Sequence, residues 1–348
     1  MTVRSSRDAV ADGKALLEVR DLKVHFPTPD GLVKAVDGVN FKIHRGETLG
    51  VVGESGSGKS VTFLTVMGLI TSKGARLEGE VIFKGRDLLK LPVEEMRHIR
   101  GKEMGMVFQD PMTSLHPMYR VGYQIAEAVL AHEAAGKKAA WKLAIDMLGR
   151  VGIPKPEEAA RRYPHEFSGG MRQRAMIAMS LVLNPDLLIA DEPTTALDVT
   201  VQAQILDLID RLKTEFNAAV AIVTHDLGVV AEHCERIHVM YAGKIVETGM
   251  SRDLFYRGRH PYTWGLLQSI PRLDAGETQR LLPIKGLPPS LIFVPPGCAF
   301  HPRCPYVMDV CRTEVPTMPP TYGRHAAACH LSPEEQERIF VAKVLQQT

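Results

Sequence analysis

The sequence predicts an α/β fold built around a mostly parallel, buried sheet, and two patterns carry that prediction. Segments that are apolar almost without interruption recur along the chain, the clearest at residues 187–190 and 219–223. Segments with helical spacing of apolar residues alternate with them, which is typical of a sheet covered on both faces. The chain has 348 residues, enough for one large domain and a smaller one.

Composition excludes several classes of protein. A net charge of +2, with 45% hydrophobic and 24% charged residues, is ordinary for a globular chain and gives no basic footprint for nucleic acid. No stretch approaches the roughly 18 apolar residues of a membrane span. Residues 1–14 are polar and have no signal-peptide core. We therefore expect a cytoplasmic chain whose partners do not include nucleic acid.

The first elements read as an antiparallel β subdomain. Residues 16–50 alternate apolar and polar side chains, which predicts short antiparallel strands joined by a turn at 27–31. Residues 48–52 then form a continuous apolar run, and residues 61–67 read as a helix. The sheet of the main fold is expected to begin at that run.

Between this strand and this helix lies a complete phosphate-loop pattern, G-x-x-x-x-G-K-S, at residues 53–60. Glycines let consecutive backbone N–H groups point at phosphate oxygens, and the helix start adds positive partial charge. Lys59 would reach the β- and γ-phosphates, and the Ser60 hydroxyl would bind Mg²⁺. The core is thus a phosphate-loop (RecA-like) fold that binds a nucleoside triphosphate, with predicted contacts from Gly53, Ser55, Gly56, Ser57, Gly58, Lys59, Ser60 and Val61.

An acidic pair ends the apolar run at 187–190. Asp191 is predicted to hold Mg²⁺, the Walker B role, because carboxylates after a buried strand complete phosphate-loop sites. Glu192, one residue further on, is placed to polarise the attacking water as general base.

A second helix N-terminus that could bind phosphate is predicted near residue 168. Ser168 is a natural N-cap, and Gly169 and Gly170 leave the start of the helix bare. A single nucleotide does not need two such helix N-termini. We therefore expect this one to bind the nucleotide held by a neighbouring subunit.

With these motifs in order, the chain resembles ATP-binding cassette (ABC) ATPases over roughly residues 16–250. The segment 167–174 resembles their signature motif. Gln109 resembles the glutamine that senses Mg²⁺ and the γ-phosphate, and Asp198 belongs to a segment like the D-loop. His225 resembles the switch histidine, and Phe26 the aromatic residue that stacks on adenine. The resemblance implies Glu192, His225 and Gln109 as catalytic residues, with ATP and Mg²⁺ as cofactors.

Finer similarity is to the ATPases of oligopeptide and dipeptide importers, carried by segments 109–115, 163–166, 260–263, 28–31 and 271–274. It implies a peripheral subunit at the cytoplasmic face of the inner membrane that powers peptide uptake through two permease subunits. The implied partners also include a paralogous ATPase in a heterodimer and, indirectly, a periplasmic or extracellular peptide-binding protein. Dipeptide, glutathione or nickel importers, and soluble cassette ATPases outside transport, are alternatives.

Domain boundaries follow from these segments. Residues 16–110 and 165–250 would form the nucleotide-binding core, and 111–164 a helical insertion with helices at 121–133 and 139–151. Thirteen of the 23 prolines lie beyond residue 250. Residues 251–348 are therefore predicted to form a small irregular module that lacks a conventional core.

Four of the five cysteines lie in this module. They lack a C-x-x-C pair, which weakens a zinc reading, but clustered thiols in a reducing compartment argue for metal more than for disulfides. Resemblance to the importer ATPases extends to this region. It makes a [4Fe–4S] cluster the leading expectation, with zinc and inert packing thiols as alternatives, for Cys298, Cys304, Cys311 and Cys329.

Overall fold

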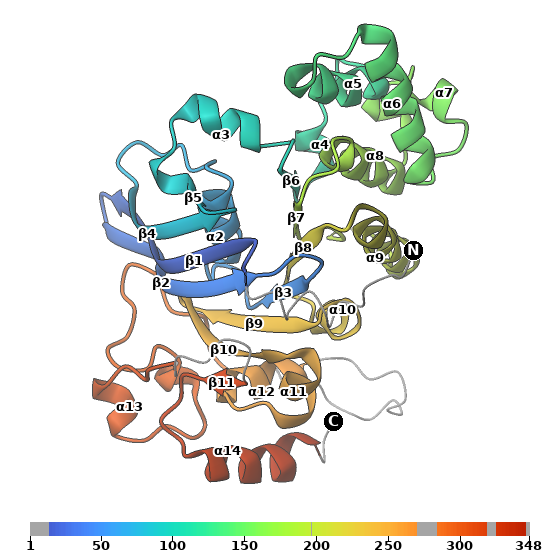
Figure 1. Ribbon diagram of the computed structural model, residues 1–348. Coiled ribbons are helices and arrows are strands. Elements are labelled where there is room, and N and C mark those ends of the chain that lie inside the picture. Colours follow the sequence, from blue (N-terminus) through green and yellow to red (C-terminus); the bar gives the residue numbers. More distant parts are fainter. Residues whose placement is uncertain (1–13, 196, 270–283, 319–324, 346–348) are drawn as a thin grey trace. The chain divides into compact units, whose positions relative to one another are not determined.

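The computed structural model describes residues 14–195, 197–269, 284–318 and 325–345, and these form two compact units (Figure 1). Unit 1 takes the described residues within Met1–Leu16, Ile43–Thr48 and Lys90–Val223, and unit 2 takes those within Leu17–Lys42, Leu49–Leu89 and Thr224–Thr348. The segment 271–274, which carried part of the importer resemblance, lies outside the described residues.

Unit 1 contains three adjacent parallel strands. They are β6 (Met104–Val107), β7 (Leu187–Asp191) and β8 (Ala219–Thr224), with β7 in the middle. Every residue of the three strands is buried, which confirms the prediction made from the apolar runs at 187–190 and 219–223, whereas β6 was not named in advance. Asp191 pairs in register with Val223, so the acidic pair lies at the carboxyl end of this parallel ladder.

The helices of unit 1 include the predicted insertion. α5 and α6 lie within a few residues of the expected ranges and pack against each other, and α6 also packs against α8. The bounds are α3 (Val93–Ile99), α4 (Pro111–Ser114), α5 (Val121–His132), α6 (Lys137–Arg150), α7 (Pro156–Ala159), η3 (Pro164–Glu166), α8 (Gly169–Leu181) and α9 (Val199–Phe216).

Unit 2 holds the antiparallel sheet, with strand order β2-β1-β4-β5 (Figure 1). β1 (Leu17–Thr28) and β2 (Gly31–Ile43) meet at the predicted turn, but they have 12 and 13 residues, so the expectation of short strands was wrong. Along β1, buried residues alternate with half-buried or exposed ones, and a register shift between Arg20 and Lys23 interrupts the alternation. β4 (Arg76–Phe83), β5 (Arg86–Asp87) and η2 (Leu88–Lys90) complete this region.

A second group of strands in unit 2 has the order β11-β10-β9-β3. β3 (Thr48–Val52) runs parallel to β9 (Arg236–Tyr241), whereas β10 (Lys244–Met250) and β11 (Ala326–Ala327) continue antiparallel. The helices of unit 2 are α2 (Lys59–Val66), α10 (Leu227–His233), α11 (Ser251–Arg257), α12 (Pro261–Gln268), α13 (Val310–Thr313) and α14 (Pro333–Phe340), with η4 (His301–Arg303) and η5 (Val341–Leu345).

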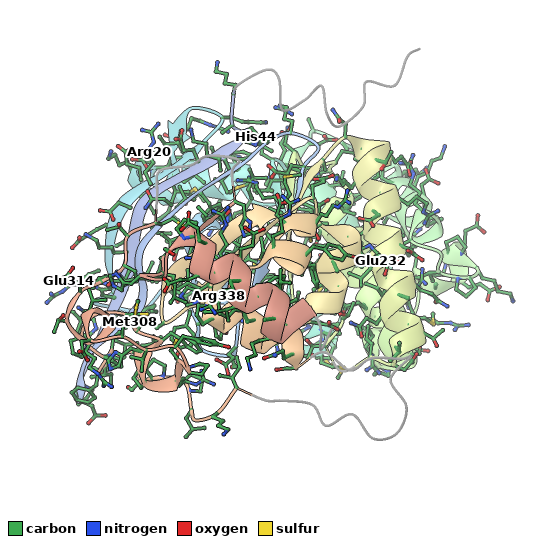
Figure 2. The ribbon with its side chains drawn as sticks, turned by 90° about the horizontal axis from the view of Figure 1, so that it is seen from below. Arg20, His44, Glu232, Met308, Glu314 and Arg338 are labelled. Atoms are coloured by element: carbon green, nitrogen blue, oxygen red, sulfur yellow. The ribbon has the colours of Figure 1, made fainter. Side chains whose placement is uncertain are left out.

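The C-terminal region has an aromatic core, so the expectation that it lacks a conventional core was wrong. Tyr262 lies against Tyr241 with ring centroids 4.6 Å apart, and Phe300 lies 5.3 Å from Tyr241. Trp264 contacts Phe340 of α14, the helix that carries Arg338 in Figure 2. Few but large aromatic side chains fill this core, which is why periodicity did not reveal it.

In the part of the chain that the structure describes, no helix combines the length and the apolar character that crossing a bilayer requires.

Candidate active site

The phosphate loop of unit 2 joins β3 to α2 and ends in a helix start without a side-chain cap. Gly58 is the N-cap residue of α2, in the left-handed region at a φ of 101°. No acidic residue occupies the first turn of α2. The positive end of the helix is therefore not neutralised by the loop itself, which favours binding of an anion such as a phosphate group.

Glycine is required at several positions of this loop. A Cβ at Gly53 would collide with the carbonyl oxygen of Met240, and one at Gly58 would collide with that of Ala35. A Cβ at Gly56 would meet no atom within 4 Å, so only its φ of 77° requires glycine there. The loop is thus packed closely against backbone at both ends.

Lys59 lies over this loop. Its Nζ donates to the carbonyl oxygens of Gly53 at 2.7 Å and Glu54 at 3.0 Å. The Ser57 hydroxyl is buried without a hydrogen-bond partner among the described residues. A phosphate oxygen is the kind of group that would satisfy such a hydroxyl.

In unit 1 the structure brings Gln109 and Glu192 together. Gln109 Nε2, just after β6, donates to Glu192 Oε2 at 3.0 Å, and the Thr195 hydroxyl donates to the same oxygen at 3.0 Å. Glu192 has a φ of 47°, and its N–H donates to Val223 O at 2.8 Å. A left-handed glutamate directly after a buried strand is a costly conformation of the kind found at functional sites.

The helix start at residue 168 forms as predicted. Ser168 Oγ accepts from Met171 N at 3.3 Å and caps α8. Asp198 caps α9 in the same way through Val201 N at 2.9 Å, and α8 packs against α9. Leu197 is the nearest neighbour of a Cβ built at Gly169, and Val201 of one built at Gly170, so both glycines lie close to the α9 side.

Sequence reasoning missed Gln173. It is buried in α8, and its Nε2 donates to the carbonyl oxygen of Pro193 at 2.6 Å. Pro193 directly follows Glu192, so Gln173 links α8 to the loop that carries Glu192, the predicted general base. The signal in the sequence was its place, five residues after Ser168, on a face of the helix that is otherwise apolar.

Two further predicted residues belong to unit 2. His225 is exposed at the end of β8, ahead of Asp226, which caps α10 through Gly228 N at 2.8 Å. Phe26 is half-buried in β1. Within the described residues of each unit, the predicted groups fall on loops and helix starts, apart from Phe26 and Asp191, which lie on strands.

The four C-terminal cysteines line one small cavity together with His260, Tyr306 and His330. Burial raises the thiol pKa of Cys304 to about 11 and that of Cys329 to about 12. No group of three or more His, Cys, Asp or Glu side chains among the described residues is arranged so that it could hold a metal ion. The thiols share a cavity, but their arrangement is not that of a ligand set.

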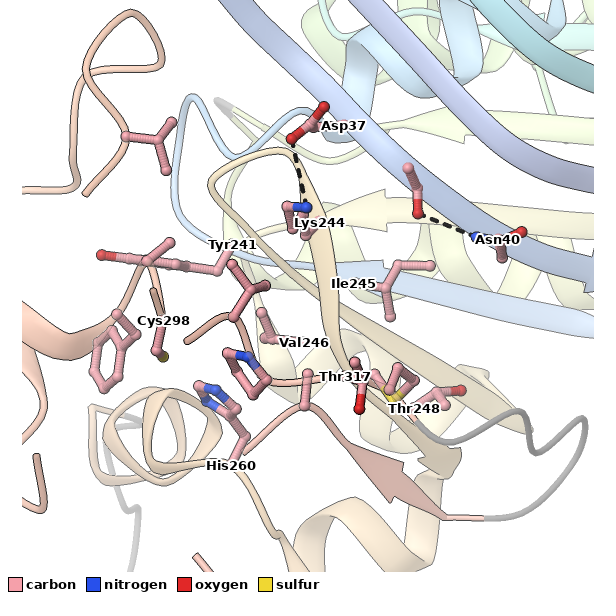
Figure 3. Close-up of a pocket in the computed structure, with 18 of the residues that line it drawn as sticks. Asp37, Asn40, Tyr241, Lys244, Ile245, Val246, Thr248, His260, Cys298 and Thr317 are labelled. Atoms are coloured by element: carbon pink, nitrogen blue, oxygen red, sulfur yellow. Dashed lines mark hydrogen bonds and ion pairs between the residues drawn. The ribbon is translucent and has the colours of Figure 1, made fainter. Parts of the chain in front are cut away.

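A larger cavity of about 690 Å³ lies next to this small one (Figure 3). Its lining includes the Asp37–Lys244 ion pair, with the Lys244 Nζ 3.4 Å from the Asp37 carboxylate. His260, Cys298 and Phe300 line both cavities. The cysteine cavity therefore borders a wide space on the side of Cys298.

Comparison with known proteins defines the class. Residues 36–195 match the family model described as "ABC transporter". The solved dimeric structure of the ATP-binding cassette MJ0796 bound to ADP and Pi is 28% identical to this chain, with a TM-score of 0.61, and covers 68% of this chain and 99% of its own. The fold predicted from the sequence, a phosphate-loop core with an antiparallel subdomain, is confirmed.

The second match is narrower. Residues 246–311 match the model "Oligopeptide/dipeptide transporter, C-terminal region". The oligopeptide transport ATP-binding protein OppD of Salmonella typhimurium is 50% identical over 95% of this chain and 98% of its own length. The dipeptide transport ATP-binding protein DppD of Bacillus subtilis is also 50% identical, over 94% and 98%. The chain belongs to the ABC transporter family, in the branch that carries this C-terminal region.

Proposed function

We propose that this chain is the ATP-hydrolysing subunit of a transporter that takes up peptides through separate membrane permease subunits. The observation that carries the proposal is the extent of the similarity. Relatives named for oligopeptide and dipeptide transport match at 50% identity across 94–95% of the chain, the C-terminal region included. Oligopeptides are the proposed cargo, and dipeptides, glutathione or nickel are the alternatives.

The proposed chemistry divides among several of the predicted residues. Lys59 and the start of α2 would bind the β- and γ-phosphates, while Ser60, Asp191 and Gln109 would hold Mg²⁺, which neutralises developing charge on the phosphates. Glu192 would take the proton of the attacking water as general base. The hydrogen bond from Gln109 to Glu192 supports this role, because it orients the carboxylate.

The remaining predicted groups would serve contacts with ATP from other directions. His225 would contact the γ-phosphate, and Phe26 would stack on adenine. Ser168, Gly169, Gly170 and Asp198 would act across a head-to-tail dimer, on the nucleotide of a paralogous ATPase subunit. Contacts made only in the closed dimer would let ATP close it and hydrolysis open it.

The helical insertion, residues 111–164, is the proposed contact for a permease. Within the insertion we propose residues 115–119 as this contact, without Leu115, which is only 1% exposed and belongs to the core. Met118 is 75% exposed, and Tyr119 stacks on Tyr123 at 5.5 Å, both half-exposed. Exposed apolar side chains of this kind favour a protein partner there. We propose peripheral attachment at the cytoplasmic face of the inner membrane through this surface, with a peptide-binding protein on the far side.

Uptake by cells tests this function. In a strain that lacks this chain, uptake of a labelled pentapeptide is expected to fall at least about tenfold. Expression of the wild-type chain should restore this uptake. Met118→Glu should not restore uptake, because charge at a buried interface is unfavourable, while ATP binding by the purified chain stays unchanged. Tyr256→Glu, at an exposed tyrosine of α11 outside the insertion, is the control. Restored uptake of dipeptide, glutathione or nickel instead of pentapeptide would replace the proposed cargo.

We also propose that the four C-terminal cysteines hold a [4Fe–4S] cluster. The observation that favours it is their placement around one cavity, since four thiols are the donor set of such a cluster. They fit in donor type and in lining one cavity, but among the described residues they are not arranged as a ligand set. When bound, the group would supply a cross-link for the module.

Metal analysis of anaerobically purified protein tests the cysteine proposal. We expect about four irons and four acid-labile sulfides per chain. Cys304→Ser should lower both, whereas Cys234→Ser, at a buried cysteine next to α10 that does not line the cavity, should not. Zinc without iron, or a metal-free protein, would exclude the cluster and leave a zinc site or packing thiols.

A further inference from the structure

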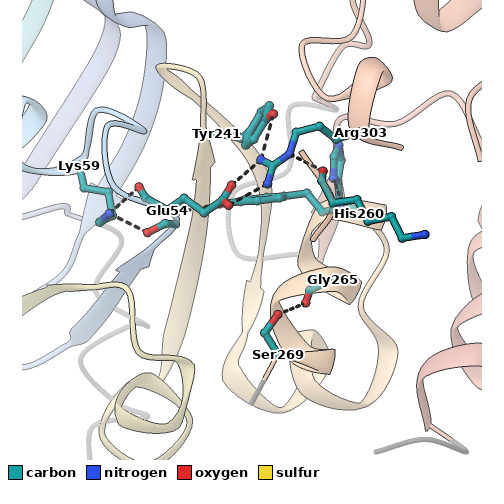
Figure 4. Close-up of polar contacts among 10 residues, drawn as sticks. Glu54, Lys59, Tyr241, His260, Gly265, Ser269 and Arg303 are labelled. Atoms are coloured by element: carbon teal, nitrogen blue, oxygen red, sulfur yellow. Dashed lines mark hydrogen bonds and ion pairs between the residues drawn. The ribbon is translucent and has the colours of Figure 1, made fainter. Parts of the chain in front are cut away.

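Arg303 of the C-terminal module reaches the phosphate loop (Figure 4). Its two terminal nitrogens donate to the two carboxylate oxygens of Glu54, at 2.6 Å and 2.9 Å. The side chain of Arg303 is 5% exposed and that of Glu54 27%. Glu54 is the second residue of the phosphate loop, so this largely buried two-point ion pair connects the loop to a segment 249 residues away in the chain.

Glu54 is held at two other atoms as well. Its N–H donates to the hydroxyl of Tyr262 at 2.8 Å, and Tyr262 is fully buried in α12. Its carbonyl oxygen accepts from Lys59 Nζ at 3.0 Å. One residue of the loop is therefore fixed at its carboxylate and its amide by the C-terminal region, and at its carbonyl by the lysine predicted to bind phosphate.

The module and strand β9 together set the position of the guanidinium. Arg303 Nε donates to the carbonyl oxygen of Lys285 at 3.1 Å, and the guanidinium carbon lies 5.9 Å from the ring centre of Tyr241. Arginine suits this place because its planar fork matches a carboxylate at two points. A lysine would keep the charge but lose that geometry.

From these contacts we propose that Arg303 is a positioning residue of the phosphate loop, through which the C-terminal module sets the affinity for ATP. The inference rests on the ATP site proposed above. Holding Glu54 fixes the backbone between Gly53 and Gly56. This stretch belongs to the loop that must adopt its binding conformation before phosphates bind. Since coupling between two sites is reciprocal, bound ATP stabilises the module as the module favours ATP.

Arg303 also lies between two of the cavity cysteines. His301 N donates to Cys298 O at 2.9 Å, and Cys304 N donates to His301 O at 3.3 Å, so residues 298–304 form one hydrogen-bonded turn. A change at Cys298 or Cys304 therefore acts on the same turn that carries Arg303. Replacement of Cys298 is therefore expected to affect the phosphate loop through this turn and Arg303.

A double-mutant cycle on ATP binding by the full chain tests the inference. Arg303→Gln and Glu54→Gln should each weaken ATP binding about tenfold, and the double variant should be no weaker than either, because both remove the same pair. Arg338→Gln, at an exposed arginine of α14, should leave affinity unchanged (Figure 2). If Arg303→Gln does not fold, Arg303→Lys and Glu54→Gln carry the test, each expected to weaken binding several-fold.

Hydrogen exchange distinguishes an effect of Arg303 on the position of the phosphate loop from an effect on the stability of the protein alone. In the wild type, ATP with Mg²⁺ should slow exchange in residues 297–306, and Arg303→Lys should abolish that protection. Cys298→Ser should weaken ATP binding when it is introduced into the wild type. It should cause no further loss of affinity when it is introduced into Arg303→Gln. Unchanged ATP affinity in a folded Arg303 variant, or additive losses in the double variant, would overturn the inference alone. A wild-type chain that binds no ATP would instead overturn the proposed function.

Discussion

Glu192→Gln is expected to lower ATP turnover by about 10²- to 10⁴-fold, the range for loss of a general base, while ATP affinity stays near that of the wild type. Glutamine has the shape of glutamate, so its carbonyl oxygen can still accept from Gln109 Nε2 and the Thr195 hydroxyl. It cannot take a proton from water. Because Glu192 adopts a left-handed conformation, a similar side chain is preferable to alanine, which would change the loop as well as the chemistry.

Two measurements check this result. Steady-state phosphate release gives the turnover, and size-exclusion chromatography with ATP and Mg²⁺ should show a persistent dimer, with the paralogous subunit where one is required. Glu215→Gln, at an exposed glutamate of α9 that pairs with Arg150, is the control and should hydrolyse ATP normally. Normal turnover in Glu192→Gln would remove Glu192 from the role of base.

Lys59→Ala acts one step earlier and is expected to weaken ATP binding about 10- to 100-fold. Hydrogen bonds to charged groups contribute about 1.5–3 kcal/mol, which corresponds to this range of affinity. The same substitution removes the two contacts from Lys59 Nζ to the carbonyl oxygens of Gly53 and Glu54. The loop thus loses both its ligand-binding cation and a local restraint.

Calorimetric titration with ATP measures this loss directly, and thermal unfolding without nucleotide measures the loss of the restraint separately. Lys73→Ala, at an exposed lysine between α2 and β4, serves as the control. An unchanged dissociation constant for Lys59→Ala would mean that the helix start and the other loop residues bind the phosphates without it.

Much of the candidate site could be predicted from the sequence because its parts are local. A run such as 187–191 becomes a buried strand from its own composition, and Ser168 or Asp198 caps the helix that follows directly. The phosphate loop needs only its glycines and its place between a strand and a helix. In each case the residues that decide the conformation are neighbours in the chain.

Contacts between distant segments could not be predicted in this way. Gln173 reaches the carbonyl of Pro193, and although it lies on an otherwise apolar face of α8, the pattern of that helix does not show which distant group it contacts. Leu115 lies in a segment without a strand or helix pattern of its own, yet the structure buries it. The C-terminal region lacked periodicity, yet its core depends on a few aromatic side chains brought together from Tyr241 to Phe340.

By itself, the sequence determined which family this chain belongs to and which residues form its phosphate loop and acidic pair. It also determined where the helices next to these motifs begin. Only the tertiary structure decided how the C-terminal module meets that site, through Arg303 and Tyr262 on Glu54. The physical reason is the range of the forces involved. Backbone conformation and capping depend on adjacent residues, whereas an ion pair between residues 249 positions apart forms only after the intervening chain has folded.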